Sequence, residues 1–167
     1  MIYTIENEYL KLSVYNVGAS IVSMQYKHDG AWLETTLRYE DLSVYSKENP
    51  YYLNSIIGPH SGRIKDGVYT YNGKTVELET NDRGNHLHGG STGFHTLTFK
   101  LRNINNTYVS LIAQDIVNAC DVGVTFSLEK RQVIIEFDVL SHKEQVINMT
   151  QHTYFNLSQE DTIENHE

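Results

Sequence analysis

The sequence is short of cysteine, proline and positive charge, and each shortage excludes a class of protein. Cys120 is the only cysteine in 167 residues, so no intramolecular disulfide can form and a disulfide-stapled mini-protein is excluded. Two prolines and eleven glycines are too few for a collagen-like chain or a proline-rich linker. With 13 Lys and Arg against 21 Asp and Glu, the formal charge is −8, which disfavours nucleic acid or an anionic membrane as a partner.

The sequence also lacks a long apolar run. No segment approaches the roughly 18 residues of a membrane-spanning helix. Residues 1–14 do not combine a basic start with an apolar stretch, as a secretory signal does. We therefore expect a cytoplasmic protein. Its 40% hydrophobic and 20% charged residues exclude a disordered chain, and its length suits one domain.

Tyrosine-rich, alternating segments predict an all-β protein. The chain holds 12 Tyr, 5 Phe and one Trp, a composition that favours strands. In residues 9–15 the apolar side chains of Leu10, Leu12 and Val14 fall on one face, as in a half-buried strand. Residues 19–26 form a second such run, and no 12-residue segment shows a convincing 3.6-residue period.

Three hairpins are predicted, each from two alternating segments that flank a short polar turn: 68–71 with 74–78, 94–104 with 108–114, and 122–129 with 133–140. The turn of the first is Asn72-Gly73, which supplies the positive φ angles that a two-residue type I′ turn demands. Together these segments predict an antiparallel β-sandwich or barrel. We expect loops at 40–54 and 80–93. Residues 162–167 end the chain inside a possible strand without a turn signal, which indicates a truncated chain.

The histidines are the first candidate functional residues. His86 and His88 stand two apart in the segment NHLHGG at 85–90, and residues two apart in an extended segment point to the same face. The pair can therefore chelate a metal or hold one ligand from one side, and Gly89-Gly90 allows a sharp turn or a close approach. A polar loop that is merely rich in histidine is the alternative interpretation.

Two further segments carry candidate residues. His152 lies in QHTYFNL at 151–157, where an imidazole can exchange a proton near neutral pH or serve only as a hydrogen-bonded structural group. Arg63 either pairs with a carboxylate or presents its donors to a hydroxyl-rich ligand. His86, His88 and a third ligand such as His152 could form an open zinc site, but no thiolate or carboxylate stands at metal-ligand spacing, and we expect no metal.

Four segments together resemble the aldose 1-epimerase (galactose mutarotase) family: GASIVSMQYK at 18–27, the run from Gly58 to Leu78, NHLHGG with Gly93-Phe94 at 85–94, and QHTYFNLS at 151–158. Their order and spacing match the N-terminal half of the family. The resemblance implies a galactose mutarotase-like supersandwich, a large antiparallel β-sandwich, that interconverts the α and β anomers of free hexoses without cofactor or metal. The sequence departs from the family pattern at Pro59, Gly62 and Gln151, and it lacks a Trp after Gly93-Phe94.

The resemblance also implies residue roles. His152 would be the general acid at the ring oxygen and His88 a second catalytic imidazole that also contacts the sugar. Arg63 would bind sugar hydroxyls, and Asn85 would belong to the substrate-binding set while shaping the loop with Gly89. The family's general base, a Glu, would lie beyond residue 167, so residues 1–167 would be the N-terminal portion of a single domain. Such a portion would be weak or inactive unless a C-terminal half or a second polypeptide completed it.

Three alternatives stay open. One is a non-catalytic carbohydrate-binding or sensing protein on the same fold, because a fold does not fix a function. Another is a metal-dependent β-barrel enzyme that uses His86 and His88. The third is a hexose-6-phosphate epimerase, which needs a basic cluster for the phosphate, and only Lys65 stands near Arg63 in the sequence.

Overall fold

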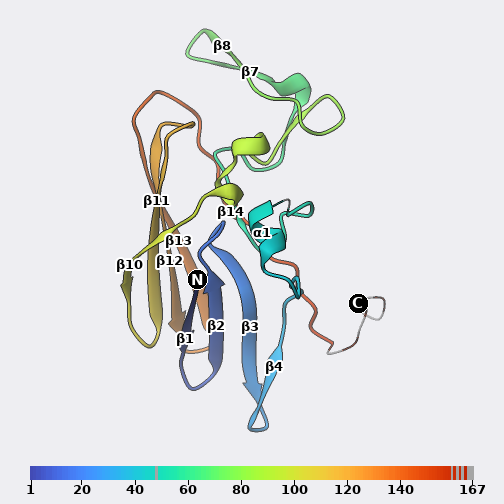
Figure 1. Ribbon diagram of the computed structural model, residues 1–167, viewed down its shortest axis with the longest axis vertical. Helices are drawn as coiled ribbons and strands as arrows, with labels where there is room; N and C mark the ends of the chain where they lie inside the picture. Colours follow the sequence, from blue (N-terminus) through green and yellow to red (C-terminus); the bar gives the residue numbers. More distant parts are fainter. Residues whose placement is uncertain (48, 159, 161, 163, 165–167) are drawn as a thin grey trace.

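The computed structural model describes residues 1–47, 49–158, 160, 162 and 164, and it confirms the all-β prediction. Two four-stranded antiparallel sheets form the body of the molecule (Figure 1). The first sheet consists, in spatial order, of β1 (Ile2–Glu6), β2 (Leu10–Tyr15), β3 (Ser20–His28) and β4 (Ala31–Glu34). The second sheet consists, in the same way, of β10 (Lys100–Ile104), β11 (Tyr108–Asp115), β12 (Cys120–Glu129) and β13 (Gln132–Ser141).

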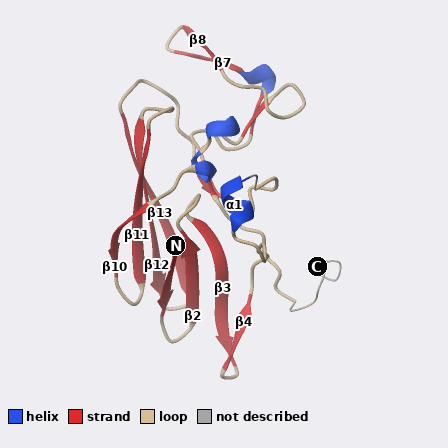
Figure 2. Cartoon of the chain, in the orientation of Figure 1, coloured by secondary structure: helices blue, strands red, loops and turns tan. Residues whose placement is uncertain are grey.

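Short elements make up the rest of the described chain and gather at one end of the molecule, beyond the β1–β4 sheet (Figure 2). The helical ones are a single turn each: α1 (Ser43–Lys47) and the 3-10 turns η1 (Lys65–Gly67), η2 (Gly90–Thr92) and η3 (Phe94–Thr96). The strands form the pairs β5 (Ile56–Ile57) with β14 (Thr150–Gln151), β6 (Arg63–Ile64) with β9 (His86–Leu87), and β7 (Val68–Tyr71) with β8 (Lys74–Glu77).

The core lies between the two large sheets and follows the alternation of their strands. Leu10, Leu12 and Val14 of β2 are buried, as the period of two predicted. They belong to one cluster with the inward residues of β11 and β12, among them Leu111 and Phe126. Burying these apolar side chains together is the main source of stability for the two sheets, and the sheets in turn support the short elements at their end.

The hairpin predictions are confirmed for β7–β8 and β12–β13 but are wrong in part for residues 94–104. The strand there begins only at Lys100, because residues 94–96 form the turn η3. Phe94 is fully buried, and its backbone N–H donates to the carbonyl of Gly58, 2.9 Å away, rather than to a neighbouring strand. Phe94 thus holds the turn η3 against the segment of Gly58 and is not part of a strand.

One side of the sandwich is open. A groove of about 420 Å³ runs between the two sheets, and its lining includes Met24, Val133, Ile135, Phe155 and Leu157. Phe155 and Leu157 are 51% and 61% exposed. Within the described residues β13 pairs only with β12, so its other edge has no strand partner there. We call this apolar cleft with the adjoining edge of β13 the open groove.

Two further predictions concern a membrane-spanning helix and a strand at the end of the sequence. In the described part of the chain, no helix has the length and apolar character needed to cross a membrane. The possible strand at 162–167 falls mainly on residues 163 and 165–167, which lie outside the described residues.

Candidate functional site

A single segment, residues 54–64, brings the predicted site residues together. Its first part pairs with the segment that carries His152: the N–H of Asn54 donates to the His152 carbonyl at 2.9 Å, and the N–H of His152 donates to the Ser55 carbonyl at 3.0 Å. Its last part pairs with the histidine-rich segment, with Arg63 opposite Leu87 in the ladder. His88, His152 and Arg63 are therefore positioned by one continuous backbone, although they lie far apart in the sequence.

Gly89 makes this convergence possible. Its φ is +86°, a conformation that side chains with a Cβ rarely adopt, and its Cα lies directly against the carbonyl of Gly58. A Cβ at this position would collide with that carbonyl and would stand 2.8 Å from Cα of Gly93. The loop after His88 can therefore pass close to residue 58 only because a glycine is present.

The Gly89→Ala variant is expected to lose about 2–4 kcal/mol of unfolding free energy, because it adds a steric collision to an unfavourable φ. Gly84→Ala is the matched control: Gly84 also has a positive φ, +81°, but no atom stands within 4 Å of the added Cβ. We expect about 1 kcal/mol there. Urea denaturation measures both, and equal losses would contradict the close approach at Gly89.

His88 and His152 form the centre of the site. Their ring centroids are 5.1 Å apart in an edge-on arrangement. The backbone N–H of Gly62 donates to Nδ1 of His88 at 3.1 Å, so that nitrogen must be the acceptor and the proton of the neutral ring resides on Nε2. Burial, and then the nearby His152, lower the pKa of His88 to about 4. At pH 7, His88 is therefore a neutral hydrogen-bond donor through Nε2–H.

Aromatic rings surround these two imidazoles. Tyr154 stacks on His152 at 5.1 Å, and Tyr52 meets the edge of His88 at 4.9 Å. The ring of His95 lies 4.8 Å from Tyr52 on a buried side chain. Motif reasoning missed Tyr52 and His95. The only sequence signals were a Tyr within a loop-like stretch and a further histidine close to NHLHGG.

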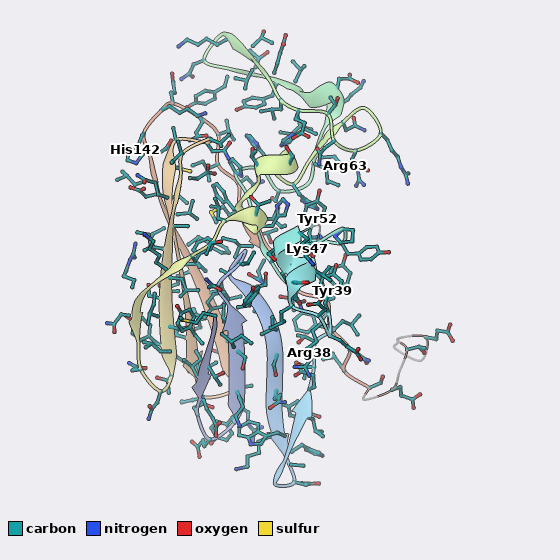
Figure 3. All side chains as sticks on the ribbon, in the orientation of Figure 1. Arg38, Tyr39, Lys47, Tyr52, Arg63 and His142 are labelled. Carbon is teal, nitrogen blue, oxygen red and sulfur yellow. The ribbon has the colours of Figure 1, made fainter. Side chains whose placement is uncertain are left out.

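Arg63 pairs with a carboxylate, which was one of the two expectations for it. Its Nε donates to Oδ2 of Asp82 at 2.6 Å, and its side chain is 59% exposed. Among the described residues nothing hydrogen-bonds to its two terminal nitrogens, so the carboxylate fixes the guanidinium while its outer donors face solvent. Figure 3 shows Arg63 and Tyr52 at the same end of the molecule, between α1 and the β7–β8 hairpin. Asp82 was not among the residues predicted from the sequence.

Asn85 shapes the turn before the histidines. Its backbone and that of Asp82 exchange two hydrogen bonds, at 2.8 and 3.0 Å, around the turn Arg83-Gly84. Its side-chain Oδ1 accepts from the N–H of Asp66 at 3.2 Å. These bonds give Asn85 a role in holding the loop, and its contribution to substrate binding stays a prediction.

The expectation that His86 and His88 share one face is wrong. The segment is not extended at that point, because His88 has a φ of +56°. His86 is buried, and its Nδ1–H donates to the carbonyl of Glu79 at 2.8 Å, while its ring lies 5.5 Å from that of His60. The two histidines thus belong to different surroundings. In the described part of the chain, no group of three or more His, Cys, Asp or Glu side chains is arranged to hold a metal ion.

The chain is similar to proteins named as epimerases and mutarotases. Residues 1–167 match the family described as aldose 1-epimerase. Galactose mutarotase from Sus scrofa is 25% identical over 162 residues, which cover 93% of this chain and 47% of that protein. Maltose epimerase from Levilactobacillus brevis is 30% identical over 158 residues, which cover 89% of this chain and 46% of that protein.

A solved structure extends the likeness to the fold. The GalM/aldose epimerase homologue from C. elegans superposes with a TM-score of 0.88 at 22% identity, over 98% of this chain and 53% of that one. The chain spans about half the length of the curated relatives it matches.

Proposed function

Because the chain belongs to the aldose 1-epimerase family, we propose that it carries the acid side of a reaction that interconverts the α and β anomers of free hexoses such as glucose and galactose. The observation that carries this proposal is the meeting of the His88 and His152 imidazoles, 5.1 Å apart, near the exposed donors of Arg63. Sugar hydroxyls both donate and accept hydrogen bonds, so imidazole and guanidinium groups suit them.

The reaction needs a proton donor at the ring oxygen, a base at the C1 hydroxyl and room for the open chain to rotate. In our proposal His152 gives its proton to the ring oxygen as the C1–O5 bond breaks. His88, held neutral, donates Nε2–H to an oxygen next to C1, and Arg63 binds hydroxyls further along the sugar. When the aldehyde recloses on its other face, the proton returns to His152. No cofactor is needed for these steps.

We propose that the general base is supplied by sequence beyond residue 167. We propose that residues 1–167 are the N-terminal portion of a single β-sandwich domain in the cytoplasm, completed by a C-terminal half or a second polypeptide. Two observations support this: the curated relatives are about twice as long, and the open groove exposes Phe155 and Leu157. The groove is apolar and borders an unpaired strand edge, so it suits strands from the completing half.

Polarimetry of freshly dissolved α-D-glucose and α-D-galactose tests the activity directly. We expect the isolated chain to leave the spontaneous rate almost unchanged, since an acid without its base provides little catalysis. Any acceleration must disappear in His152→Ala. An acceleration of a hundredfold or more by the isolated chain would overturn the assignment of the base to missing sequence, and one that survives His152→Ala would overturn the role of His152.

Arg63→Ala is expected to weaken hexose binding by about tenfold, because a charged donor to a sugar hydroxyl contributes about 1.4 kcal/mol or more. Arg102→Ala is the matched control, since Arg102 also pairs with a carboxylate, Asp138, at 3.3 Å, but on β10. An NMR titration with galactose measures both affinities. Equal weakening in the two variants would remove Arg63 from the binding site.

The second candidate function, a non-catalytic carbohydrate-binding protein, uses the same residues. It predicts that galactose binding depends on Arg63, but that no completing polypeptide ever produces mutarotation. The complementation experiment in the Discussion separates it from the enzyme.

A further inference from the structure

We propose that Tyr52 is a positioning residue that sets the placement of the His88 and His152 imidazoles relative to each other. The inference rests on the proposed function for its catalytic meaning, but its evidence is the geometry of the ring. Tyr52 meets His88 edge-on at 4.9 Å and 73°, and His95 at 4.8 Å and 75°. It also lies 6.3 Å from His152. One side chain thus contacts both imidazoles of the site and a buried third.

The backbone holds Tyr52 in a conformation that a residue with a side chain rarely adopts. Its φ is +53°, in the left-handed region. Its N–H donates to the carbonyl of Asn49 at 2.9 Å, and its own carbonyl accepts from the N–H of Ser55 at 3.2 Å. The buried Asn49 side chain braces the same turn, because it accepts from the N–H of Leu53 and donates to Oγ of Ser55, both at 2.8 Å. Strain that the surroundings enforce in this way is typical of functional positions.

The hydroxyl of Tyr52 connects the ring to the backbone just before His88. The side-chain amide of Asn81 donates to that hydroxyl at 3.4 Å. The same amide donates to the Leu87 carbonyl at 3.0 Å, and its oxygen accepts from the Leu87 N–H at 2.8 Å. Tyr52 is therefore held against the histidine segment by its ring on one side and through Asn81 on the other.

Tyr52 is one of several groups that surround His88. The groups that face His88 are His152, Arg63, Asp82, His86, His95 and Tyr52 itself. Of these, Tyr52 contributes an aromatic ring in T-shaped contact with His88. Without that ring, water reaches His88 and the imidazole gains freedom to rotate away from the Gly62 N–H.

The test is NMR of ¹⁵N-histidine in the 167-residue chain between pH 7.5 and pH 4, with Tyr52→Leu, Tyr52→Phe and the control Tyr51→Leu. Tyr51 is the neighbouring residue in the same turn and is 65% exposed. In the wild type, Tyr52→Phe and Tyr51→Leu, we expect His88 to keep its proton on Nε2 and to titrate near pH 4. In Tyr52→Leu, we expect both tautomers and a midpoint at least one pH unit higher, while the amide signals of β12 and β13 stay in place.

A folded Tyr52→Leu protein with an unchanged His88 tautomer and midpoint overturns the proposal. If Tyr52→Leu does not fold, tyrosine ring labelling of the wild type replaces it: the Tyr52 resonances must then show a step at the midpoint of His88, and their failure to do so also overturns it. None of these signals depends on turnover. The Tyr52 proposal can therefore be tested even if the chain has no mutarotase activity. A failure of the Tyr52 proposal likewise leaves the proposed function untouched.

Discussion

If the proposed function holds, supplying a C-terminal half in trans is expected to raise the mutarotation rate of this chain by roughly 10²- to 10⁴-fold, the usual contribution of a general acid–base pair. The experiment co-expresses the chain with the C-terminal half of the Levilactobacillus brevis maltose epimerase, a relative whose matched part is 46% of its length. Under the proposed function, the added half would bring the general base to the C1 hydroxyl, while this chain would provide His152 and His88. Polarimetry of α-D-glucose, α-D-galactose and maltose measures the rate.

Two variants in this chain test whether the increase in rate depends on His152 and on the open groove. His152→Ala must return the complemented protein to the spontaneous rate. Leu157→Asp must prevent assembly, because it places a charge in the open groove, yet it costs the isolated chain little since Leu157 is 61% exposed. Ile116→Asp is the matched control, at 84% exposure in the turn between β11 and β12.

Assembly without any rise in rate would favour the carbohydrate-binding alternative over the enzyme. A rate that rises equally in Leu157→Asp and in the wild type would show that the completing half binds elsewhere than the open groove.

Acidification from pH 7 to pH 4 is expected to destabilise the folded chain by several kcal/mol. Burial lowers the pKa of His95 to about 4, and burial with His152 does the same for His88. The pKa of His60 is lowered as well, first by burial. Above pH 6.5, the ordinary value, these residues are neutral in both states and the stability is complete. Between about pH 6.5 and pH 4 the unfolded chain binds protons that the folded chain refuses, so stability falls with falling pH.

The size of the effect follows from the difference between the pKa of each histidine in the unfolded chain and its pKa in the folded chain. For His95, which is 7% exposed, it corresponds to roughly 3 kcal/mol. The contribution of His88 is smaller because that ring is only partly buried. Urea midpoints at pH 7, 6, 5 and 4.5 measure the decline. His95→Phe should reduce the decline, and a decline that is the same in His95→Phe as in the wild type would contradict the prediction.

Local patterns predicted the large sheets well, since strands such as β2 and β12 carry a period of two and their turns carry recognisable residues. They missed β1 and β4, which are short and flank the regular runs. They also placed the start of β10 too early. Phe94 looks like the first residue of the strand because it is apolar, but its backbone N–H donates to the Gly58 carbonyl instead of joining a strand ladder.

The site was predictable only as far as motifs reach. The resemblance predicted roles for His88, His152 and Arg63, and the structure brings these residues to one end of the molecule. It could not identify Tyr52 or Asp82, because their roles depend on a left-handed turn and on a pairing between β6 and β9 that no local pattern encodes. The expectation for His86 was wrong because it assumed an extended backbone through His88, whose φ is positive.

The pairing of residues 54–57 with 150–152 has a consequence for the order of folding. The hydrogen bonds from Gln151 and Tyr154 to Asn54 close loops of 97 and 100 residues, a large entropic cost for a pairing of so few residues. The β10–β13 sheet lies inside that loop and forms from neighbouring strands, so its folding shortens the loop before the ends meet. We expect the two histidines to come together last. In native-state hydrogen exchange, the amides of His152 and Tyr154 should then open together, at a lower free energy than those of β12.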